Sequence, residues 1–228
     1  MMRRGLFEAD SHDGLPLADE IVACGEHDGV QLYPAWARFY QGVVAAQDAD
    51  PRPGIAVMRQ VRQGLHENKV GLFAPIHLYH LATAHRRCGE YDIAFGLIEE
   101  GIRIIETTGE RMFEAELYRL RGELQLEIGQ GDAGEAALTT AVAVARRQQA
   151  RLWELRATVA LARYQGENGG LVAAKDLLAP LYGWFSEGLG SPDLKRAREL
   201  LEWLHCSRLP AGFAATDGFP CQTLRAGR

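Results

Sequence analysis

Three histidines and one cysteine are the residues of this sequence whose types suit them to hold a metal ion. His77 and His80 stand three positions apart, so on a helix both would face one side, and His85 and Cys88 follow them. The step from His80 to His85 turns away from that side. The sequence contains no H-E-x-x-H motif and no second cluster of ligands. We therefore expect no metal site and no cofactor, and we interpret these residues as parts of a packed helix.

Glutamates are the other side chains whose chemistry would suit catalysis. Carboxylates act as general acids and bases, but here they stand in segments that are also rich in arginine. We expect solvated helix faces with ion pairs at Glu99, Glu100, Glu114, Glu116, Glu123 and Glu127. Ser186 lies in W-F-S-E-G, which lacks the first glycine of the G-x-S-x-G motif. No catalytic residue follows from these patterns, so we expect a protein that is not an enzyme.

The composition is that of a folded, soluble protein. Of the 228 residues, 47% are hydrophobic and 24% are charged. The formal net charge of −5 and the pI of about 5.8 give no overall reason to bind nucleic acid. Arg146, Arg147 and Arg151 form a local basic cluster, but Glu154 stands beside them, and we interpret this cluster as a solvated face.

The cysteines and the hydropathy pattern indicate the compartment. Cys24, Cys88, Cys206 and Cys221 form no C-x-x-C pair, so we expect reduced thiols. The N-terminal segment has no apolar signal core, and no later run approaches the length that crosses a membrane. These features predict a cytoplasmic protein that binds neither a membrane nor nucleic acid directly.

The elements that would position all these side chains are helices. Apolar residues recur at three- and four-residue spacings between short turns that contain glycine or proline. The expected helices cover residues 15–27, 35–47, 54–66, 75–88, 91–106, 110–128, 133–148, 152–164, 171–185 and 192–204. We expect an all-α protein with a flexible lead-in at 1–14, one repeat domain at 15–204 and a flexible tail at 205–228. Helix 15–27 reads as the second helix of a hairpin that lacks its first.

Small residues recur with a period of 40 residues. The series Gly42, Ala82, Gly122 and Ala162 is followed, 12 positions after each member, by a second series at Gly54, Ala94, Gly134 and Ala174. Such residues stand where two antiparallel helices approach closely. A period in this range is typical of a solenoid of helical hairpins. We expect about four hairpins and a C-terminal capping helix.

Several segments resemble a known bacterial family. They are L-Y-R-L-R-G-E-L at 117–124, W-E-L-R-A at 153–157, L-A-R at 161–163, A-K-D-L-L-A-P-L-Y-G-W-F at 174–185 and P-D-L-K at 192–195. These segments are similar to the C-terminal tetratricopeptide-like repeats of bacterial adenylate/guanylate cyclase–ATPase proteins and ATP-dependent transcriptional regulators. The resemblance covers roughly residues 15–204 and implies a right-handed superhelix. The sequence has no G-x-x-x-x-G-K-[ST] motif, so the ATPase activity of that family does not carry over.

The tetratricopeptide register places one set of aromatic and charged residues along a concave groove. Counted from the first small-residue series, the set is Trp36, Phe39, Tyr79, Arg86, Arg87, Glu116, Arg119, Glu123, Arg156 and Arg163. Such side chains can hold a peptide or a helix by burial and charge-assisted hydrogen bonds. The competing interpretation is that the three aromatic residues form the core between repeats and the arginines only solubilise the surface.

These observations predict a non-catalytic protein–protein interaction module of a bacterial signalling or regulatory system. Its partner would be a protein or peptide, such as an ATPase or cyclase domain supplied in trans. A second hypothesis is a separated C-terminal regulatory fragment of an adenylate cyclase or an ATP-dependent transcriptional regulator. A third, weaker hypothesis is a small-molecule-sensing repeat domain. Self-association through the N-terminal end face around Leu17 and Ile21 is an additional expectation about partners.

Overall fold

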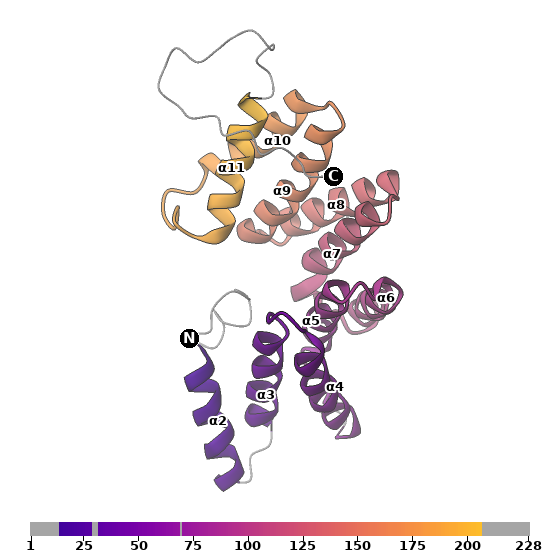
Figure 1. Cartoon of the computed structure of the whole chain (residues 1–228), viewed down its shortest axis with the longest axis vertical. Helices are drawn as coiled ribbons and strands as arrows, with labels where there is room; N and C mark the ends of the chain where they lie inside the picture. Colours follow the sequence, from indigo (N-terminus) through magenta and orange to yellow (C-terminus); the bar gives the residue numbers. More distant parts are fainter. Residues whose placement is uncertain (1–13, 29–31, 69, 207–228) are drawn as a thin grey trace. The chain divides into compact units, whose positions relative to one another are not determined.

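The computed structural model describes residues 14–28, 32–68 and 70–206. Within these ranges the chain consists of helices and connecting turns and contains no strand, which confirms the expected all-α class (Figure 1). The helices are α2 (Leu15–Asp28), α3 (Leu32–Ala45), α4 (Arg52–Glu67), α5 (Ala74–Arg87), α6 (Tyr91–Thr108), η2 (Arg111–Phe113), α7 (Glu114–Glu127), α8 (Gly131–Arg147), α9 (Arg151–Glu167), α10 (Leu171–Gly183) and α11 (Pro192–Cys206). The expected lead-in at 1–14 and tail at 205–228 lie outside the described residues, apart from Gly14, His205 and Cys206.

The helix boundaries follow the sequence closely, with one division that we did not expect. The segment expected as a single helix over 110–128 begins with the short 3-10 helix η2 before α7 starts. Glu110, just before η2, accepts a hydrogen bond from the backbone N–H of Phe73 at 2.9 Å. This bond ties the start of the segment to the residue that precedes α5.

The 40-residue period is visible in the turns that end α5, α7 and α9. Gly89, Gly129 and Gly169 adopt φ values of +73°, +79° and +90°, a conformation that only glycine adopts at little cost. In each turn the next residue donates its N–H to a carbonyl five positions back, which closes the helix. The three bonds are Glu90 to His85 at 3.0 Å, Gln130 to Gln125 at 2.8 Å and Gly170 to Gln165 at 2.8 Å.

The described chain divides into two compact units, Met1–Gly134 and Glu135–Arg228, and the boundary lies within α8. In the first unit, α3 pairs with α4 and α5 pairs with α6, as the hairpin pattern predicts. The first helices of successive hairpins also touch, since α3 packs on α5 and α5 on α7. We call the surface carried by α3, α5 and α7 the first-helix face.

Glycine permits the closest helix approach of the first unit. A Cβ atom added at Gly54 of α4 would lie 2.4 Å from the carbonyl oxygen of Gly42 of α3 and 2.3 Å from the backbone nitrogen of Ala46. In the next hairpin the corresponding residues, Ala82 and Ala94, are fully buried. The small-residue series therefore marks helix contacts, as the sequence indicates.

Helix α2 packs against α3. Its Ala18 is buried with Tyr40 and Val44 of α3, and Leu15, Ile21 and Val22 pack partly buried against this cluster. The apolar side chains expected on an open N-terminal end face are thus partly covered by α3. Leu17 is half-buried.

The second unit has its own core, built by α9, α10 and α11. Leu155, Ala162, Ala174 and Leu178 pack with α11 residues that the sequence assigns to a capping helix. Those α11 residues are Leu194, Ala197, Leu200 and Leu204. Ser191 accepts a long hydrogen bond from the N–H of Leu194 at 3.5 Å, in keeping with its expected position before the first turn of α11.

Candidate binding surface

Six side chains of α5 and α7 form a continuous set of hydrogen bonds on the first-helix face. This polar network consists of Tyr79, Arg86, Glu116, Arg119, Glu123 and Glu127. Five of these residues belong to the set that the sequence assigns to a groove. The sixth, Glu127, was not predicted as a groove residue. The network therefore brings half of that set into one patch within the first unit.

Arg119 of α7 stands at the centre of the network. Its Nε and Nη2 atoms donate to the two oxygens of Glu116 at 2.9 and 3.0 Å, and Nη2 also donates to Tyr79 Oη at 2.8 Å. Nη1 donates to Glu123. Burial alone would lower the pKa of Arg119, but the charges of Glu116 and Glu123 outweigh it, and the pKa lies well above its usual value. The guanidinium is a permanent cation held in a fixed plane.

Arg86 of α5 extends the network to the end of α7. Its guanidinium donates to Glu123 and, through Nε, to both oxygens of Glu127 at 3.1 Å. Burial would raise the pKa of Glu123, yet the charges of Arg119 and Arg86 dominate and lower the pKa of this carboxyl. The pKa of Arg86 is raised despite its burial, because Glu127 and Glu123 accept its hydrogen bonds. The side chains thus hold each other ionised.

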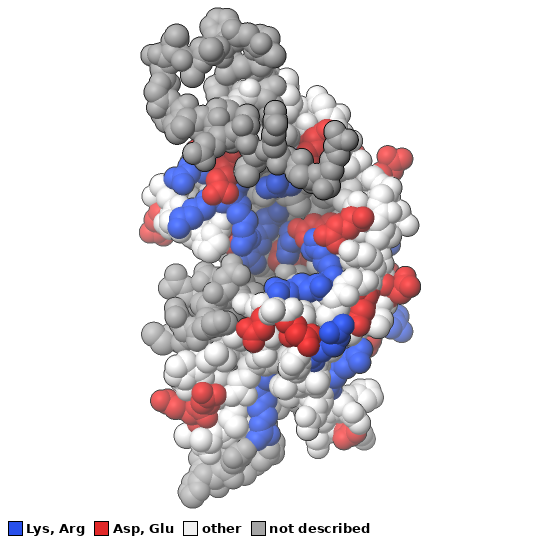
Figure 2. Space-filling model, in the orientation of Figure 1, with Lys and Arg blue, Asp and Glu red and all other residues white. Residues whose placement is uncertain are grey.

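The arginines of this patch are compensated by the protein itself. Arg86 and Arg119 face the carboxylates of Glu116, Glu123 and Glu127, which gives the network a formal charge of −1. Lys and Arg side chains alternate with Asp and Glu side chains on the visible face of the molecule as well (Figure 2). A partner carboxylate would have to displace a glutamate to reach either guanidinium. The two arginines of the network are therefore already paired with carboxylates of the chain itself.

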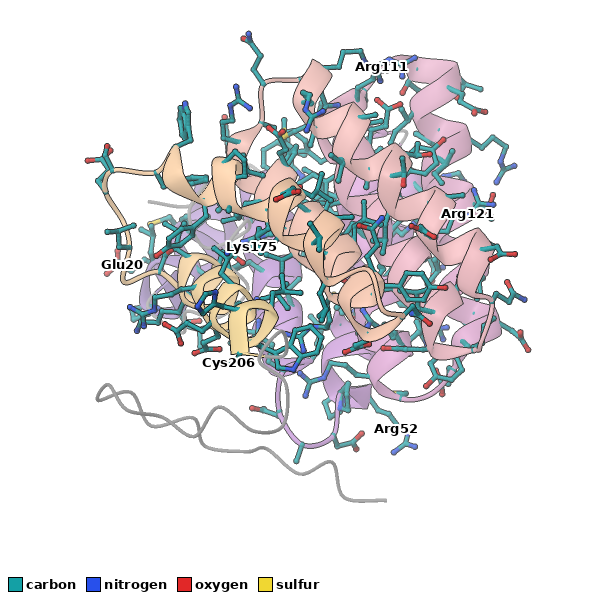
Figure 3. The ribbon with its side chains drawn as sticks, turned by 90° about the horizontal axis from the view of Figure 1, so that it is seen from above. Glu20, Arg52, Arg111, Arg121, Lys175 and Cys206 are labelled. Carbon is teal, nitrogen blue, oxygen red and sulfur yellow. The ribbon has the colours of Figure 1, made fainter. Side chains whose placement is uncertain are left out.

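Two glutamates expected on solvated faces are buried instead. Glu114 is 8% exposed and Glu116 is 1% exposed. Each has an arginine partner three residues away, since Arg111 Nη1 reaches Glu114 at 2.9 Å and Arg119 reaches Glu116. Burying an ionised carboxylate costs little stability only when it is paired with an opposite charge and hydrogen-bonded. Arg121, labelled in Figure 3, contacts Glu99 of α6 at 3.3 Å and so takes no part in the network.

The two aromatic residues expected from α3 differ in position. Phe39 is 1% exposed and packs in the core, with its ring 4.3 Å from the ring of His77. Trp36 is half-buried between Tyr33, which is 58% exposed, and Phe73, whose ring lies 5.0 Å away. Its indole N–H has no hydrogen-bond partner in the part of the chain that the structure describes. Trp36 can contribute to a surface, whereas Phe39 contributes packing.

The remaining residues of the expected set lie apart from the network. Arg87 points to the preceding hairpin, where it donates to the backbone carbonyls of Gln47 and Asp48 at 2.9 and 3.0 Å. Arg156 belongs to the second unit and donates to Asp193 of α11 through Nε at 2.9 Å and Nη2 at 2.7 Å. Arg163 is exposed on α9.

A constant separation of 37 residues along the sequence would have identified the side chains that pair with the predicted groove residues. Tyr79 and Glu116, Arg86 and Glu123, and Arg156 and Asp193 are each 37 residues apart. This separation equals the 40-residue period minus about one helical turn, which is the offset between neighbouring first helices. A search of the sequence for opposite charges at this spacing would have selected Asp193.

The histidines of α5 are packing residues. His77, His80 and His85 are all buried. Burial, together with the positive charge of nearby His80 and Arg62, lowers the pKa of His77 to about 3, so it is neutral. His85 lies between Arg59 Nη2, at 3.1 Å from its Nε2, and Glu90 at its Nδ1. Within the described ranges no three His, Cys, Asp or Glu side chains converge closely enough to hold a metal ion.

None of the helices in residues 14–28, 32–68 and 70–206 combines the length and the apolar character needed to cross a bilayer.

Comparison with known proteins identifies the fold. No protein-family profile and no curated protein matches the sequence. Among solved structures, the chain is similar to a putative kinesin light chain with nearly identical TPR-like repeats from Podosopora anserina. The TM-score is 0.57 at 16% identity, over 75% of this chain and 85% of that one. A single-substitution variant of the same protein gives a TM-score of 0.54 at 17% identity, over 75% and 92%. The shared feature is an all-α fold of tetratricopeptide-like helical repeats.

Proposed function

We propose that this chain is a non-catalytic interaction module that binds a protein or peptide along its first-helix face. The observation that carries this proposal is the polar network of α5 and α7, which spans two consecutive repeats and whose most exposed charged side chain is Glu127, at 38%. Every charged member is held by a neighbour, so the surface exists before a partner arrives. A preformed surface avoids the entropy cost of ordering side chains on binding.

The exposed chemistry of the network defines the partner that it suits. The side chains of Glu123 and Glu127 are 23% and 38% exposed, and the partner would place hydrogen-bond donors against these carboxylates. Trp36 and Tyr33 add apolar area on α3. This pattern favours a segment that offers N–H donors or basic groups beside apolar side chains, in an extended or helical form.

The family resemblance suggests the cellular setting of the proposed module. We propose that the module acts in the cytoplasm of a bacterial cell, within a signalling or regulatory system, with an ATPase or cyclase domain supplied in trans as the partner. The matching segments lie in α7, α9, α10 and α11. A separated regulatory fragment of a cyclase or transcriptional regulator fits the same segments. A neighbouring reading frame that encodes a phosphate loop beside a cyclase or winged-helix domain would favour the fragment.

The test is a pull-down from extracts of the source cell with the tagged full chain. Thr83 is half-buried on α5 between Tyr79 and Arg86, so Thr83→Arg places a large side chain on the proposed surface. Gln60 is exposed on α4, and Gln60→Arg adds the same side chain on a second helix. We expect Thr83→Arg to lose partners that Gln60→Arg retains. The same partner list with both variants would contradict the proposed surface.

A further inference from the structure

A pocket of about 470 Å³ opens between two consecutive hairpin turns of the first unit. The turn between α5 and α6 and the start of α6 supply Gly89, Tyr91, Asp92 and Phe95. The turn between α7 and α8 supplies Ile128 and Gln130. The lining therefore combines two aromatic rings, an aliphatic side chain, one carboxylate and one amide. None of these six residues is basic.

The preceding pair of turns shows what closes such a junction. There Arg87, at the end of α5, reaches back to the turn between α3 and α4. Its Nη2 atom donates to the carbonyl oxygens of Gln47 and Asp48 at 2.9 and 3.0 Å. These carbonyls follow the C-terminus of α3, where the helix dipole favours a cation. An arginine of the chain itself thus bridges the first two turns.

At the next junction, between the α5–α6 turn and the α7–α8 turn, the residue that corresponds to Arg87 is acidic and does not form this bridge. In the 40-residue register Glu127 takes the position of Arg87, and the carbonyls that correspond to those of Gln47 and Asp48 belong to Arg87 and Cys88. Glu127 does not reach toward that turn, since its carboxylate accepts the hydrogen bonds of Arg86. None of the six described residues that line the pocket supplies a cation at this junction.

We propose that this pocket binds an arginine side chain of a partner protein, which would join the two turns of this junction as Arg87 joins the two turns one repeat earlier. The guanidinium would stack on Tyr91 or Phe95 and pair with Asp92, while its aliphatic stem packs on Ile128. A planar guanidinium suits stacked and bidentate contacts better than an ammonium does. Tyr91, Asp92 and Ile128 are all exposed.

This inference rests on the proposed function only in that the occupant belongs to a protein partner. The pocket lies at the hairpin turns, whereas the polar network lies along α5 and α7. Asp92→Asn alters the pocket alone, whereas Glu127→Arg also removes a network partner of Arg86. Loss of arginine binding would leave the result with Thr83→Arg unaffected.

The experiment titrates the full, isotope-labelled chain with acetyl-arginine methylamide and follows backbone amide shifts by NMR. Acetyl-citrulline methylamide, which is nearly isosteric but neutral, and acetyl-lysine methylamide are the comparison probes. We expect saturable shifts at Gly89, Phe95 and Gln130 with the arginine probe. Asp92→Asn should weaken this binding about fivefold, the effect of losing one exposed charge contact. Glu106→Gln removes one exposed charge from the other end of α6 and should change nothing.

A second variant tests the comparison between repeats. Glu127→Arg restores the residue type of Arg87, so its side chain should occupy the junction and abolish binding of the probe. The proposal is overturned by equal shifts with the citrulline probe, by equal affinity for the lysine probe, or by unchanged binding in Asp92→Asn. Undiminished binding in Glu127→Arg would overturn it as well.

Discussion

Arg119 and Glu116 form a two-point ion pair within one turn of α7, with Nε to Oε1 at 2.9 Å and Nη2 to Oε2 at 3.0 Å. The carboxylate is 1% exposed and the arginine side chain 14% exposed. A charge buried to this extent is stable only while its partner remains. The pair therefore fixes the polar network in place, and its removal should be costly.

Neutralising Glu116 should destabilise the first unit. Glu116→Gln removes the carboxylate that forms the two-point pair with the Arg119 guanidinium, and we expect a loss of about 2–4 kcal/mol in the free energy of unfolding. Adding Arg119→Met removes the other member of the same pair, so the double variant should lose clearly less than the sum of the single losses. Urea unfolding followed by circular dichroism measures both quantities. Glu99→Gln disrupts the exposed pair with Arg121 and should cost about 0.5 kcal/mol or less. Additive losses at Glu116 and Arg119 would contradict the coupling.

The buried His77 should make stability depend on pH. Its pKa in the folded chain is about 3, below the ordinary value of 6.5, so the unfolded chain takes up the proton first as the pH falls. Stability is complete above pH 6.5 and should decline below it by up to about 1.4 kcal/mol per pH unit. His77→Leu should flatten this slope between pH 6.5 and 5. The lowered pKa of Glu123 affects the stability of the fold only below this pH window, where that carboxyl begins to take up a proton in the unfolded chain.

His66 supplies the control for this titration, because it is exposed at the end of α4. His66→Gln should keep the slope of the unmodified chain. Equal slopes in all three proteins over pH 6.5–5 would show that burial of His77 does not produce the effect.

Two glycines of α4 should respond to alanine in opposite directions. A Cβ at Gly54 meets the carbonyl oxygen of Gly42 in α3 at 2.4 Å and the backbone nitrogen of Ala46, just after α3, at 2.3 Å. Gly54→Ala must therefore separate the helices and should cost about 1–3 kcal/mol. At Gly64 nothing lies within 4 Å, and alanine there should add about 0.5–1 kcal/mol because it favours the helix. Thermal unfolding of the two variants gives the comparison. Similar melting temperatures would contradict the close approach of α3 and α4.

The pairing of Arg156 with Asp193 should stabilise the second unit. Asp193 lies in the first turn of α11, its side chain is 11% exposed, and Arg156 donates to it at 2.7 and 2.9 Å. Asp193→Asn should cost about 1–2 kcal/mol, because it removes a charge-assisted hydrogen bond and a favourable charge at a helix N-terminus. Asp176→Asn, at an exposed position of α10, should stay within about 0.5 kcal/mol. No difference between the two variants in urea unfolding would contradict this role.

The sequence predicts the helices and their period because both depend on residue size and polarity along the chain. Gly42 and Gly54 had to be small for two helices to touch, and Gly89, Gly129 and Gly169 had to be glycine for the turns to close. These requirements are local and leave a pattern that can be read from the residue types alone.

The fate of each groove residue was less predictable because it depends on the neighbouring repeat. The tetratricopeptide register places Arg86 and Arg119 on α5 and α7, but it does not reveal that Glu123 and Glu127 compensate them. It also does not distinguish Phe39 in the core from Trp36 at the surface. That difference arises from packing against α5, where the ring of His77 covers Phe39.

The most direct test of the proposed function is photocrosslinking of a partner from defined positions. The full chain carries benzoylphenylalanine at Thr83 of α5 or at Gln60 of α4 and is irradiated in cells of the source organism. We predict that the chain with the crosslinker at Thr83 yields a discrete partner adduct and that the chain with the crosslinker at Gln60 does not. We also predict that an excess of a competing chain without crosslinker, carrying Thr83→Arg, does not suppress the Thr83 adduct. A partner adduct formed equally from Gln60, or only from Gln60, would contradict binding at the first-helix face.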